Sequence, residues 1–432
     1  MNVKSDIIAG KKIAIYTLGC KVNQYESDSM MEVLSKAGAL IVEFDEGADV
    51  YIINTCSVTN MAERKSRQII HRAKKKNENA VIIACGCYVQ AEKEKLENDL
   101  SIDIIVGNNR KNEIVRILEE YYEDKGINDN FIDINNSNEY EYMYLEMPTE
   151  HCRAYVKVQD GCNNFCTYCI IPYTRGRIRS RNPKDVVEEV IRLAKRGIKE
   201  VVITGINLSS YEYEGNDLLK LLNLVSEIDG IERIRMGSLE PRIITDEFLE
   251  AISKNEKICP HFHLSLQSAC NDTLKRMNRK YTIEEYMERC ELIRKYYEMP
   301  ALTTDVIVGF PGETEEEFET TVKNLEALNL YEMHIFKYSK RNGTIAAQMP
   351  NQVRDEIKEA RSNILLEMTK RHKEQYEKYF KGKKEKVLVE EFVEKEGKTV
   401  FKGHTTRYIL VEKAAPKSLC EDYVNKIIEV EL

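Results

Sequence analysis

The chain has 432 residues, of which 42% are hydrophobic and 31% charged. This composition excludes a wholly disordered chain, and no apolar run approaches the ~20 residues that cross a bilayer. At roughly 150 residues per domain, we expect two or three domains. The first twelve residues are charged and carry no apolar signal segment, so we expect a cytoplasmic protein that does not bind a membrane.

The charge balance and the cysteines narrow the function further. The net charge is −8, with 64 Lys and Arg against 72 Asp and Glu, which argues against a general nucleic-acid coat protein. Local basic patches remain compatible with this total, because salt screens charges over about 8 Å. Twelve cysteines are more informative. Disulfides are rare in the cytoplasm, so clustered cysteines there indicate metal or redox chemistry.

Residues 11–122 alternate short apolar runs with amphipathic stretches. The expected strands are residues 12–17, 49–54, 80–84 and 102–107, with helices near 23–37, 59–76, 88–98 and 110–122. Such alternation is typical of a parallel sheet covered on both faces, and it predicts an open α/β domain. Residues 123–150 are rich in Asn, Glu and Tyr, and we interpret them as a linker with room for one edge strand.

Residues 151–336 repeat a strand-then-helix pattern. The six candidate strands are residues 155–159, 200–204, 233–237, 261–266, 303–308 and 332–336, and a helical pattern follows the first five. The clearest helix start is Thr314, where Glu317 completes a capping box. Six units with right-handed crossovers predict a partial (β/α) barrel, since a full barrel needs eight strands.

The last part of the chain changes character again. Residues 352–380 are charged and indicate one long helix or a pair of helices. Residues 380–432 contain alternating runs at 386–392, 399–403, 407–411 and 426–430. Runs of period two at this spacing predict a small C-terminal β-barrel.

Three cysteines within eight residues form the sharpest motif. Cys162, Cys166 and Cys169 follow the first strand of the six-unit region, so their loop lies at the rim where α/β active sites are found. A structural zinc site usually takes four ligands from two separated pairs, but Cys152 lies before the strand and no second pair follows. Three thiolates on a [4Fe–4S] cube leave one iron open, and we therefore favour an iron–sulfur site.

A second set of cysteines is spread over the N-terminal domain. Cys20, Cys56 and Cys87 each lie just beyond a predicted parallel strand. The carboxyl ends of parallel strands meet at one edge of a sheet, so these three thiols could converge there. The alternative is that they are buried free thiols, which are common in protein cores.

Both motifs resemble known sequences. The spacing of Cys162, Cys166 and Cys169, with Tyr168 before the last, resembles the radical S-adenosylmethionine (SAM) superfamily. The segments TLGCKVNQYE (residues 17–26), NTCSV (54–58) and GCYVQ (86–90) resemble the methylthiotransferase family within it, and most closely the MtaB branch. The resemblance covers residues 11–122, 151–378 and 380–432.

This resemblance implies an architecture and a set of cofactors. Residues 11–122 would be a methylthiotransferase N-terminal domain with an auxiliary [4Fe–4S] cluster, 151–378 a radical SAM core with a second [4Fe–4S] cluster, and 380–432 a TRAM-like RNA-binding domain. The family motif selects Cys87 rather than Cys85 as the third auxiliary ligand. Four further cysteines match no ligand of the family and are interpreted as packing or surface residues: Cys259, Cys270, Cys290 and Cys420.

The resemblance also implies residues that bind SAM. These lie in segments that follow the second to fifth barrel strands: Gly205, Asn207, Glu240, Ser265, Gln267 and Gly309. A glycine in such a segment lets the backbone approach a ligand closely. The alternative for any one of them is an ordinary βα turn. No histidine lies in a motif that demands a general base, and we assign no catalytic residue.

Basic stretches suggest contact with RNA. Arg175, Arg177, Arg179 and Arg181 alternate directly after the cluster loop, and four like charges repel unless an anion or an acidic surface meets them. RNA is one such partner, and acidic residues of the protein itself are the other. A second basic stretch covers residues 64–76, and a third, at 370–386, carries interleaved aromatic residues.

The implied activity is transfer of a methylthio group to carbon 2 of N6-threonylcarbamoyladenosine at position 37 of tRNA, in the anticodon loop. In the family, the auxiliary cluster carries or donates sulfur that one SAM methylates, and a second SAM gives the radical that removes the hydrogen at carbon 2. This requires an electron donor such as flavodoxin or ferredoxin and a source of sulfur. The alternatives are the sister branch acting on N6-isopentenyladenosine, a radical enzyme whose auxiliary cluster only transfers electrons, and a non-catalytic RNA-binding protein with structural metal.

Overall fold

The computed structural model describes residues 5–123, 130–146, 152–415 and 421–432. Cys420 and part of the predicted linker lie outside these ranges. The chain forms two compact units. The first comprises Met1–Thr149, Lys157–Asn182 and Ser339–Ala347, and the second comprises Glu150–Val156, Pro183–Tyr338 and Gln348–Leu432.

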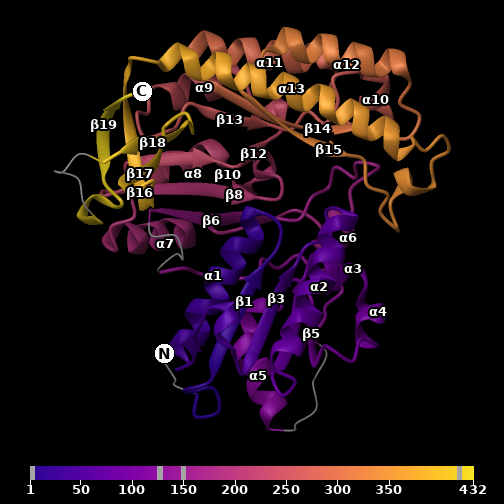
Figure 1. Ribbon diagram of the computed structural model, residues 1–432, viewed down its shortest axis with the longest axis vertical. Helices are drawn as coiled ribbons and strands as arrows, with labels where there is room; N and C mark the ends of the chain where they lie inside the picture. The colour runs from indigo at the N-terminus through magenta and orange to yellow at the C-terminus, as the bar shows by residue number, and fades with distance from the viewer. Residues whose placement is uncertain (1–4, 124–129, 147–151, 416–420) are drawn as a thin grey trace. The chain divides into compact units, whose positions relative to one another are not determined.

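The first unit is built on a parallel five-stranded sheet (Figure 1). Its order is β2 (Leu40–Ile41), β1 (Lys12–Thr17), β3 (Val50–Thr55), β4 (Val81–Gly86) and β5 (Ile104–Val106). β3 and β4 are buried at every position, which confirms the prediction of a parallel sheet covered on both faces. The two-residue strand β2 was not predicted, because its residues are exposed and too few to give a pattern.

Helices cover this sheet where the amphipathic stretches predicted them. They are α1 (Lys21–Lys36), α2 (Asn60–Lys76), α3 (Cys87–Ala91), α4 (Lys93–Glu97) and α5 (Ile114–Tyr122), with short 3-10 turns at Phe44–Glu46 and Lys111–Glu113. The Thr59 side chain caps α2 by accepting from the backbone of Ala62 at 3.1 Å. Residues 130–146, the described part of the linker, contain no strand or helix.

The first unit also contains the end of β6 (Arg153–Asp160), the loop with three cysteines, α6 (Ile171–Thr174) and β7 (Arg179–Ser180). β7 pairs antiparallel with β6, so that Asp160 lies opposite Arg179. Through this short hairpin, the arginine run pairs with the strand that precedes the cysteine loop.

In the second unit, the strands of the partial barrel begin and end within two residues of the predicted positions. After β6 come β8 (Glu200–Gly205), β11 (Arg233–Met236), β12 (Ser238–Leu239), β13 (His261–Leu264), β14 (Ala301–Val308) and β15 (Glu332–Lys337). β11 pairs with β8, whereas β12 pairs with β13. Because this predicted strand breaks at Gly237, its two parts belong to two sheets, β11-β8-β6 and β12-β13-β14-β15. The predicted number of six strand-and-helix units is confirmed.

Helices follow the barrel strands in order (Figure 1). They are α7 (Pro183–Lys195), α8 (Leu218–Ser226), α9 (Asp246–Ser253), α10 (Asn271–Arg276), α11 (Ile283–Tyr296) and α12 (Glu315–Leu328). α8 follows a small hairpin of β9 (Glu212–Tyr213) and β10 (Asn216–Asp217). The predicted capping box is confirmed: Thr314 and Glu317 exchange bonds at 3.2 and 3.3 Å at the start of α12.

The end of the chain forms one helix and a small sheet. α13 (Asp355–Phe380) is a single 26-residue helix. β16 (Lys384–Lys395), β17 (Lys398–Thr405), β18 (Leu410–Ala414) and β19 (Ile427–Glu431) pair antiparallel in the order β18-β17-β16-β19. In the described residues the predicted barrel is thus a four-stranded half-barrel, and its core contains Val387, Val389, Phe401 and Val411.

Buried arginines of the barrel hold this terminal sheet. Arg233 donates to the carbonyl oxygens of His404 (2.9 Å) and Lys386 (2.7 Å), and Arg235 donates to Thr406 (3.0 Å). Both guanidinium groups pair with the buried carboxylate of Glu200. None of the helices among the described residues is long and apolar enough to cross a membrane.

Candidate cysteine and cofactor sites

The structure brings Cys20, Cys56 and Cys87 to one edge of the N-terminal sheet. They follow β1, β3 and β4, which are neighbours in the sheet. Burial raises the pKa of the Cys56 thiol to about 12, and the nearby thiols of Cys87 and Cys20 raise it further. Desolvation raises the pKa of the Cys20 thiol, while the Arg175 guanidinium opposes this rise. The convergence expected for parallel strand ends is therefore present.

Glycines make this convergence sterically possible. Gly19 has a φ of +109°, and a Cβ there would lie 3.0 Å from the sulfur of Cys56. Gly86 has a φ of +97°, and its Cβ would lie 2.5 Å from the carbonyl oxygen of Thr55. Only glycine adopts such conformations without strain. The glycine before the cysteine in both motifs therefore allows the sharp turn that aims the thiol across the sheet edge.

Arg175 lies beside the Cys87 thiol. Its Nε donates to the sulfur at 3.2 Å, its Nη2 donates to Asn23 Oδ1 at 2.6 Å, and its Nη1 donates to Glu26 Oε1 at 2.8 Å. The side chain is completely buried. Asn108 also approaches the Cys87 sulfur, at 3.7 Å. Donors directed at sulfur favour the thiolate, which is the form that binds metal.

The arginine belongs to a buried ion network. Glu26 on α1 also pairs with Lys111 and Lys157, and Asp160 pairs with Arg175 and Lys157. Burial by itself would raise the pKa of Glu26, but its cationic neighbours hold that pKa well below its ordinary value. With Arg179, four buried cations contact two buried carboxylates.

This surplus of positive charge fits the cluster that the family motif implies. A [4Fe–4S]2+ core held by three thiolates carries a net charge of about −1. Such an anion is stabilised by buried cations and by N–H donors to sulfur. The donor set, the charge and the N–H···S contact on Cys87 therefore all suit an iron–sulfur cluster. Cys85, whose pKa burial raises to about 12, is completely buried within β4 and lies among the core residues.

The loop of Cys162, Cys166 and Cys169 is fixed by its backbone. Gly161 turns the chain with a φ of +72°, where a Cβ would lie 1.8 Å from the carbonyl oxygen of Arg177. The amide of Cys162 donates to Gly176 at 3.1 Å, and that of Cys169 donates to Cys166 at 3.0 Å. Three thiols in one short, anchored loop again suit an iron–sulfur cluster. Cys152, at the other end of β6, directs its thiol to the carbonyls of Val389 and Glu390.

Most of the arginine run lies inside the first unit. Arg175, Arg179 and Arg181 are buried, with exposed fractions of 0%, 4% and 1%. Arg179 lies 3.7 Å from Asp160, and Arg181 donates to the Tyr25 hydroxyl at 3.2 Å. Acidic and polar groups of the protein therefore meet the charge of these three side chains, which is the alternative to RNA that the sequence left open. Arg177 is partly exposed and stacks over Phe165 at 4.6 Å, so it stays a candidate RNA contact.

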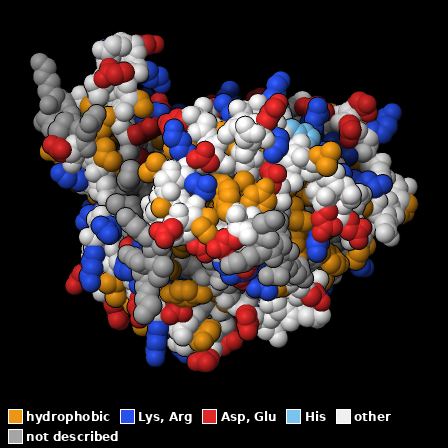
Figure 2. Space-filling view, turned by 90° about the horizontal axis from the view of Figure 1, so that it is seen from below, with side chains coloured by type: hydrophobic (Ala, Val, Ile, Leu, Met, Phe, Trp, Pro, Cys, Tyr) orange, Lys and Arg blue, Asp and Glu red, His pale blue; other side chains and the backbone are white. Residues whose placement is uncertain are grey.

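The basic stretch on α2 has ordinary surface contacts. Arg72 and Lys76 pair with Asp45, and Lys74 pairs with Asp103. Exposed pairs of this kind contribute ~0–1 kcal/mol and leave the cations accessible. On the face drawn in Figure 2, basic and acidic side chains are interspersed.

The predicted SAM residues of the second unit lie at the carboxyl ends of its strands. Gly205 ends β8, Glu240 follows β12, and Ser265 follows β13. The backbone amide of Glu240 donates to Ser209 Oγ at 2.8 Å, and this bond joins the loops that follow β8 and β12. Asn207 is buried at the start of a 3-10 turn, Leu208–Ser210. These segments therefore lie side by side at one rim of the barrel.

Gln267 and Gly309 both adopt left-handed backbone conformations. Gln267 has a φ of +77°, and its backbone bridges to β14 by bonds to Asp305 and Ile307. Gly309 has a φ of +70°, and its amide donates to Glu313 at 2.6 Å. A Cβ on Gly309 would meet the Lys358 side chain at 2.3 Å. A non-glycine residue held in this region costs of order 1–3 kcal/mol, and such strain is commonly found at binding sites.

Two residues that organise this rim were missed by the sequence analysis. Arg279 donates to both carboxylate oxygens of Glu240 at 3.1 Å and to the carbonyl of Ser265 at 3.3 Å. Tyr281 donates to the carbonyl of Leu266 at 2.9 Å. Both lie beyond α10, outside any motif, and only the fold brings them to the strand ends.

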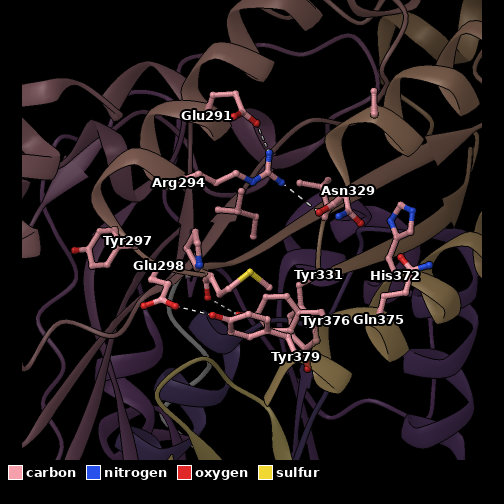
Figure 3. A pocket seen from close by; sticks show the side chains of 15 residues that line it. Glu291, Arg294, Tyr297, Glu298, Asn329, Tyr331, His372, Gln375, Tyr376 and Tyr379 are labelled. Carbon is pink, nitrogen blue, oxygen red and sulfur yellow. Dashed lines mark hydrogen bonds and ion pairs between the residues drawn. The ribbon is translucent and has the colours of Figure 1, made fainter. Parts of the chain in front are cut away.

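A cavity of about 630 Å³ opens elsewhere in the second unit (Figure 3). It lies among α11, α13 and the first residues of β14, and its walls include Tyr297, Tyr331, Tyr376 and Arg294. Pro300 and Leu302 place it at the amino end of β14, whereas the predicted SAM segments follow the carboxyl ends. None of the six predicted SAM residues lines it.

Comparison with known proteins identifies the family. The Radical SAM superfamily model matches residues 156–325, and the model of Uncharacterized protein family UPF0004 matches residues 12–107. Threonylcarbamoyladenosine tRNA methylthiotransferase MtaB of Bacillus subtilis (strain 168) is 38% identical over 97% of this chain and 93% of its own length. The MtaB of Aquifex aeolicus (strain VF5) is 41% identical over 88% of this chain and 92% of its own length.

The chain belongs to the radical SAM methylthiotransferase family. A sister enzyme, tRNA-2-methylthio-N(6)-dimethylallyladenosine synthase of Thermodesulfovibrio yellowstonii (strain ATCC 51303 / DSM 11347 / YP87), is 37% identical over 93% of both chains. Among solved structures, the radical S-adenosylmethionine methyltransferase TsrM from Kitasatospora setae matches with a TM-score of 0.58 at 14% identity, covering 78% of this chain and 77% of that chain. This likeness shows that the methylthiotransferase shares the fold of that enzyme.

Proposed function

We propose that this methylthiotransferase transfers a methylthio group to carbon 2 of N6-threonylcarbamoyladenosine at position 37 of tRNA, using SAM and two [4Fe–4S] clusters. The observation that carries the proposal is the nearly full-length relationship to enzymes named for this reaction, and the two separate cysteine sites of this chain support it. The relatives named for the isopentenyladenosine reaction match slightly less well, and the activity of the sister branch is not favoured.

The two cysteine sites have different roles in this proposal. We assign residues 11–122 to the auxiliary cluster, 151–378 to the radical core, and 380–432 to contact with tRNA. Cys20, Cys56 and Cys87 would hold the auxiliary cluster, and Cys162, Cys166 and Cys169 the radical cluster. When bound, the clusters and SAM supply the electron, the sulfur and the methyl group of the reaction.

The chain's own residues prepare these sites. Arg175 donates to the Cys87 sulfur, while Glu26 and Asp160 hold the arginine in place. At the barrel rim, Glu240 and Ser265 are fixed by Arg279, so that the strand-end segments present carbonyl and carboxylate oxygens in a constant arrangement. Such oxygens accept hydrogen bonds from an ammonium group, which SAM carries.

The proposal includes partners outside the chain. We propose that a small electron carrier such as flavodoxin or ferredoxin reduces the radical cluster, that a separate source supplies sulfur, and that the reaction takes place in the cytoplasm. The lysines of the terminal sheet and Arg177 are the candidate contacts for the tRNA.

Single cysteine variants test the assignment. With tRNA, reductant and SAM, Cys87→Ala should still form 5′-deoxyadenosine but no methylthiolated nucleoside, because the radical loop keeps its own three ligands. Cys166→Ala should lose both products. Cys85→Ala is the matched control and should keep substantial activity, since a buried thiol acts as a small apolar group. If Cys85→Ala is inactive and Cys87→Ala is active, the ligand assignment is wrong. If tRNA lacking the threonylcarbamoyl group is modified equally well, the proposed substrate is wrong.

A further inference from the structure

Three potential metal ligands meet on the sheet of the second unit, outside both cysteine sites. His263 on β13, Asp305 on β14 and His334 on β15 each offer one ligand atom, and these atoms lie within 4.8 Å of one another. Among the described residues, these three form the group of histidine, cysteine and acidic side chains whose ligand atoms lie this close together. The proposed reaction assigns it no role.

The strand register explains why these side chains meet. β13, β14 and β15 run parallel, with His263 opposite Thr303 and Asp305 opposite His334. Residues two apart on a strand share a face, so all three side chains project from the same face of the sheet. The alternate residues Phe262, Leu264 and Val306 are completely buried on the other face.

The distances suit coordination to one ion. His263 Nε2 lies 3.4 Å from Asp305 Oδ2, and His334 Nδ1 lies 3.1 Å from Asp305 Oδ1. The first separation is longer than an ordinary N–H···O bond of ~2.7–3.2 Å. Around a tetrahedral Zn²⁺ with bonds of ~2.0–2.1 Å, neighbouring ligand atoms are roughly 3.3–3.4 Å apart. The pairs therefore need little movement to bind a cation between them.

The surroundings also resemble those of a metal site. His263 Nδ1 contacts Thr303 Oγ1 at 3.0 Å, which can fix the ring with Nε2 directed at Asp305. Such a contact to the second nitrogen orients most histidine ligands of metals. The His334 side chain is 52% exposed, so an ion can enter from solvent. Two imidazoles and one carboxylate form a ligand set that suits zinc and other divalent transition metals.

We propose that His263, Asp305 and His334 bind one divalent transition-metal ion, such as Zn²⁺, in addition to the iron of the clusters. Three protein ligands leave at least one position open to water or to an oxygen atom of a bound molecule. The site would thus be a mononuclear centre on one face of the strands β13–β15.

Zinc binding to the cluster-loaded, full-length protein tests this proposal. After dialysis against Zn²⁺ and a weak chelator, metal analysis should find one zinc per chain in the wild type and none in Asp305→Asn or His334→Gln. Thr303→Val should keep the site but weaken binding by ~10–100-fold, the range for loss of a contact that orients a ligand. His71→Gln removes a histidine paired with Asp99 alone at 3.0 Å and should bind zinc as the wild type does.

X-ray absorption at the zinc edge keeps the test independent of the variants. The wild type should give a shell of nitrogen and oxygen neighbours with the scattering of two imidazoles. A sulfur shell would place the zinc on cysteines and overturn the proposal. A wild type that retains no zinc, or an Asp305→Asn variant that binds it as tightly, would overturn it as well. Iron content and circular dichroism equal to those of the wild type establish that each variant is folded.

Discussion

Replacing Arg175 by methionine removes the centre of the buried ion network and keeps most of the side-chain volume. The substitution deletes bonds to Glu26, Asp160, Asn23 and the Cys87 sulfur. Breaking a buried pair by removing one partner costs ~3–5 kcal/mol, because the remaining charge is left without compensation. Glu26 keeps Lys111 and Lys157, so we expect the lower end of this range, about 3 kcal/mol. That energy corresponds to roughly a hundredfold change in an equilibrium constant.

Hydrogen exchange measured on the full-length chain without clusters isolates this effect. Amides of β3 and β4 that exchange by unfolding of the first unit should exchange ~100-fold faster in Arg175→Met. Amides of β14, in the second unit, serve as the control within the same molecule. Arg64→Met, on the exposed face of α2, is the matched surface variant and should change stability by less than ~0.5 kcal/mol.

The same variant should alter the loaded auxiliary cluster. Hydrogen bonds to cluster sulfurs help to set its reduction potential. Loss of the Nε donor and of a buried cation disfavours the extra negative charge of the reduced state. The midpoint potential, followed by electron paramagnetic resonance, should therefore become more negative. Unchanged exchange of β3 and β4 together with an unchanged potential would refute the role given to Arg175.

Three further outcomes are expected. Protein reconstituted without oxygen should bind about eight irons per chain. A variant with Cys162, Cys166 and Cys169 all replaced by alanine should bind about half as many. Stoichiometric zinc in place of iron would contradict the assignment. Gly86→Ala should lose the auxiliary irons, because its Cβ would lie 2.5 Å from Thr55, whereas Gly47→Ala, whose Cβ meets no atom within 4 Å, should keep them. Burial by itself would raise the pKa of Glu200, but Arg235 and the neighbouring arginines hold it at about 2. The ionised carboxylate therefore stabilises the folded state above pH ~4.5, and this stabilisation is lost as the pH falls toward 2. The destabilisation caused by Glu200→Gln, measured by urea unfolding, should thus be about 2 kcal/mol smaller at pH 3 than at pH 6, and an equal loss at both would refute the ion pair.

The strands were predictable because their signals are local. β3 and β4 consist of continuous apolar residues that are buried at every position. The same holds for the start of α12, where Thr314 and Glu317 are three residues apart and form the bonds that the motif predicts. The approach of Cys20, Cys56 and Cys87 followed from topology, since parallel strands must end at one edge. In each of these cases a short stretch of chain, or a rule of sheet geometry, contains the information.

The arginine run could not be interpreted from local sequence. Its partner Glu26 lies 149 residues before Arg175 in the chain, on the buried face of a helix rich in polar residues. Nothing in the spacing of that helix marks Glu26 as an ion-pair residue. Arg279 and Tyr281 were missed for the same reason, because they act through carbonyl groups that only the folded barrel brings near.

The location of these charges also changes how contact with tRNA must be sought. Arg175, Arg179 and Arg181 are occupied inside the first unit, and Arg233 and Arg235 anchor the terminal sheet from within the barrel. Deleting residues 380–432 would therefore strip the carbonyl partners from two buried guanidinium groups and disturb the barrel together with any RNA surface.

Substitution of single surface lysines is the cleaner perturbation. Lys384 and Lys395 are exposed and pair with glutamates on the surface of the sheet. Since such exposed pairs contribute only ~0–1 kcal/mol, a phosphate group can displace the glutamate without a large cost. Lysines that contact RNA are thus to be sought among such weak surface pairs, whereas Arg175, Arg179 and Arg181 are held in the interior.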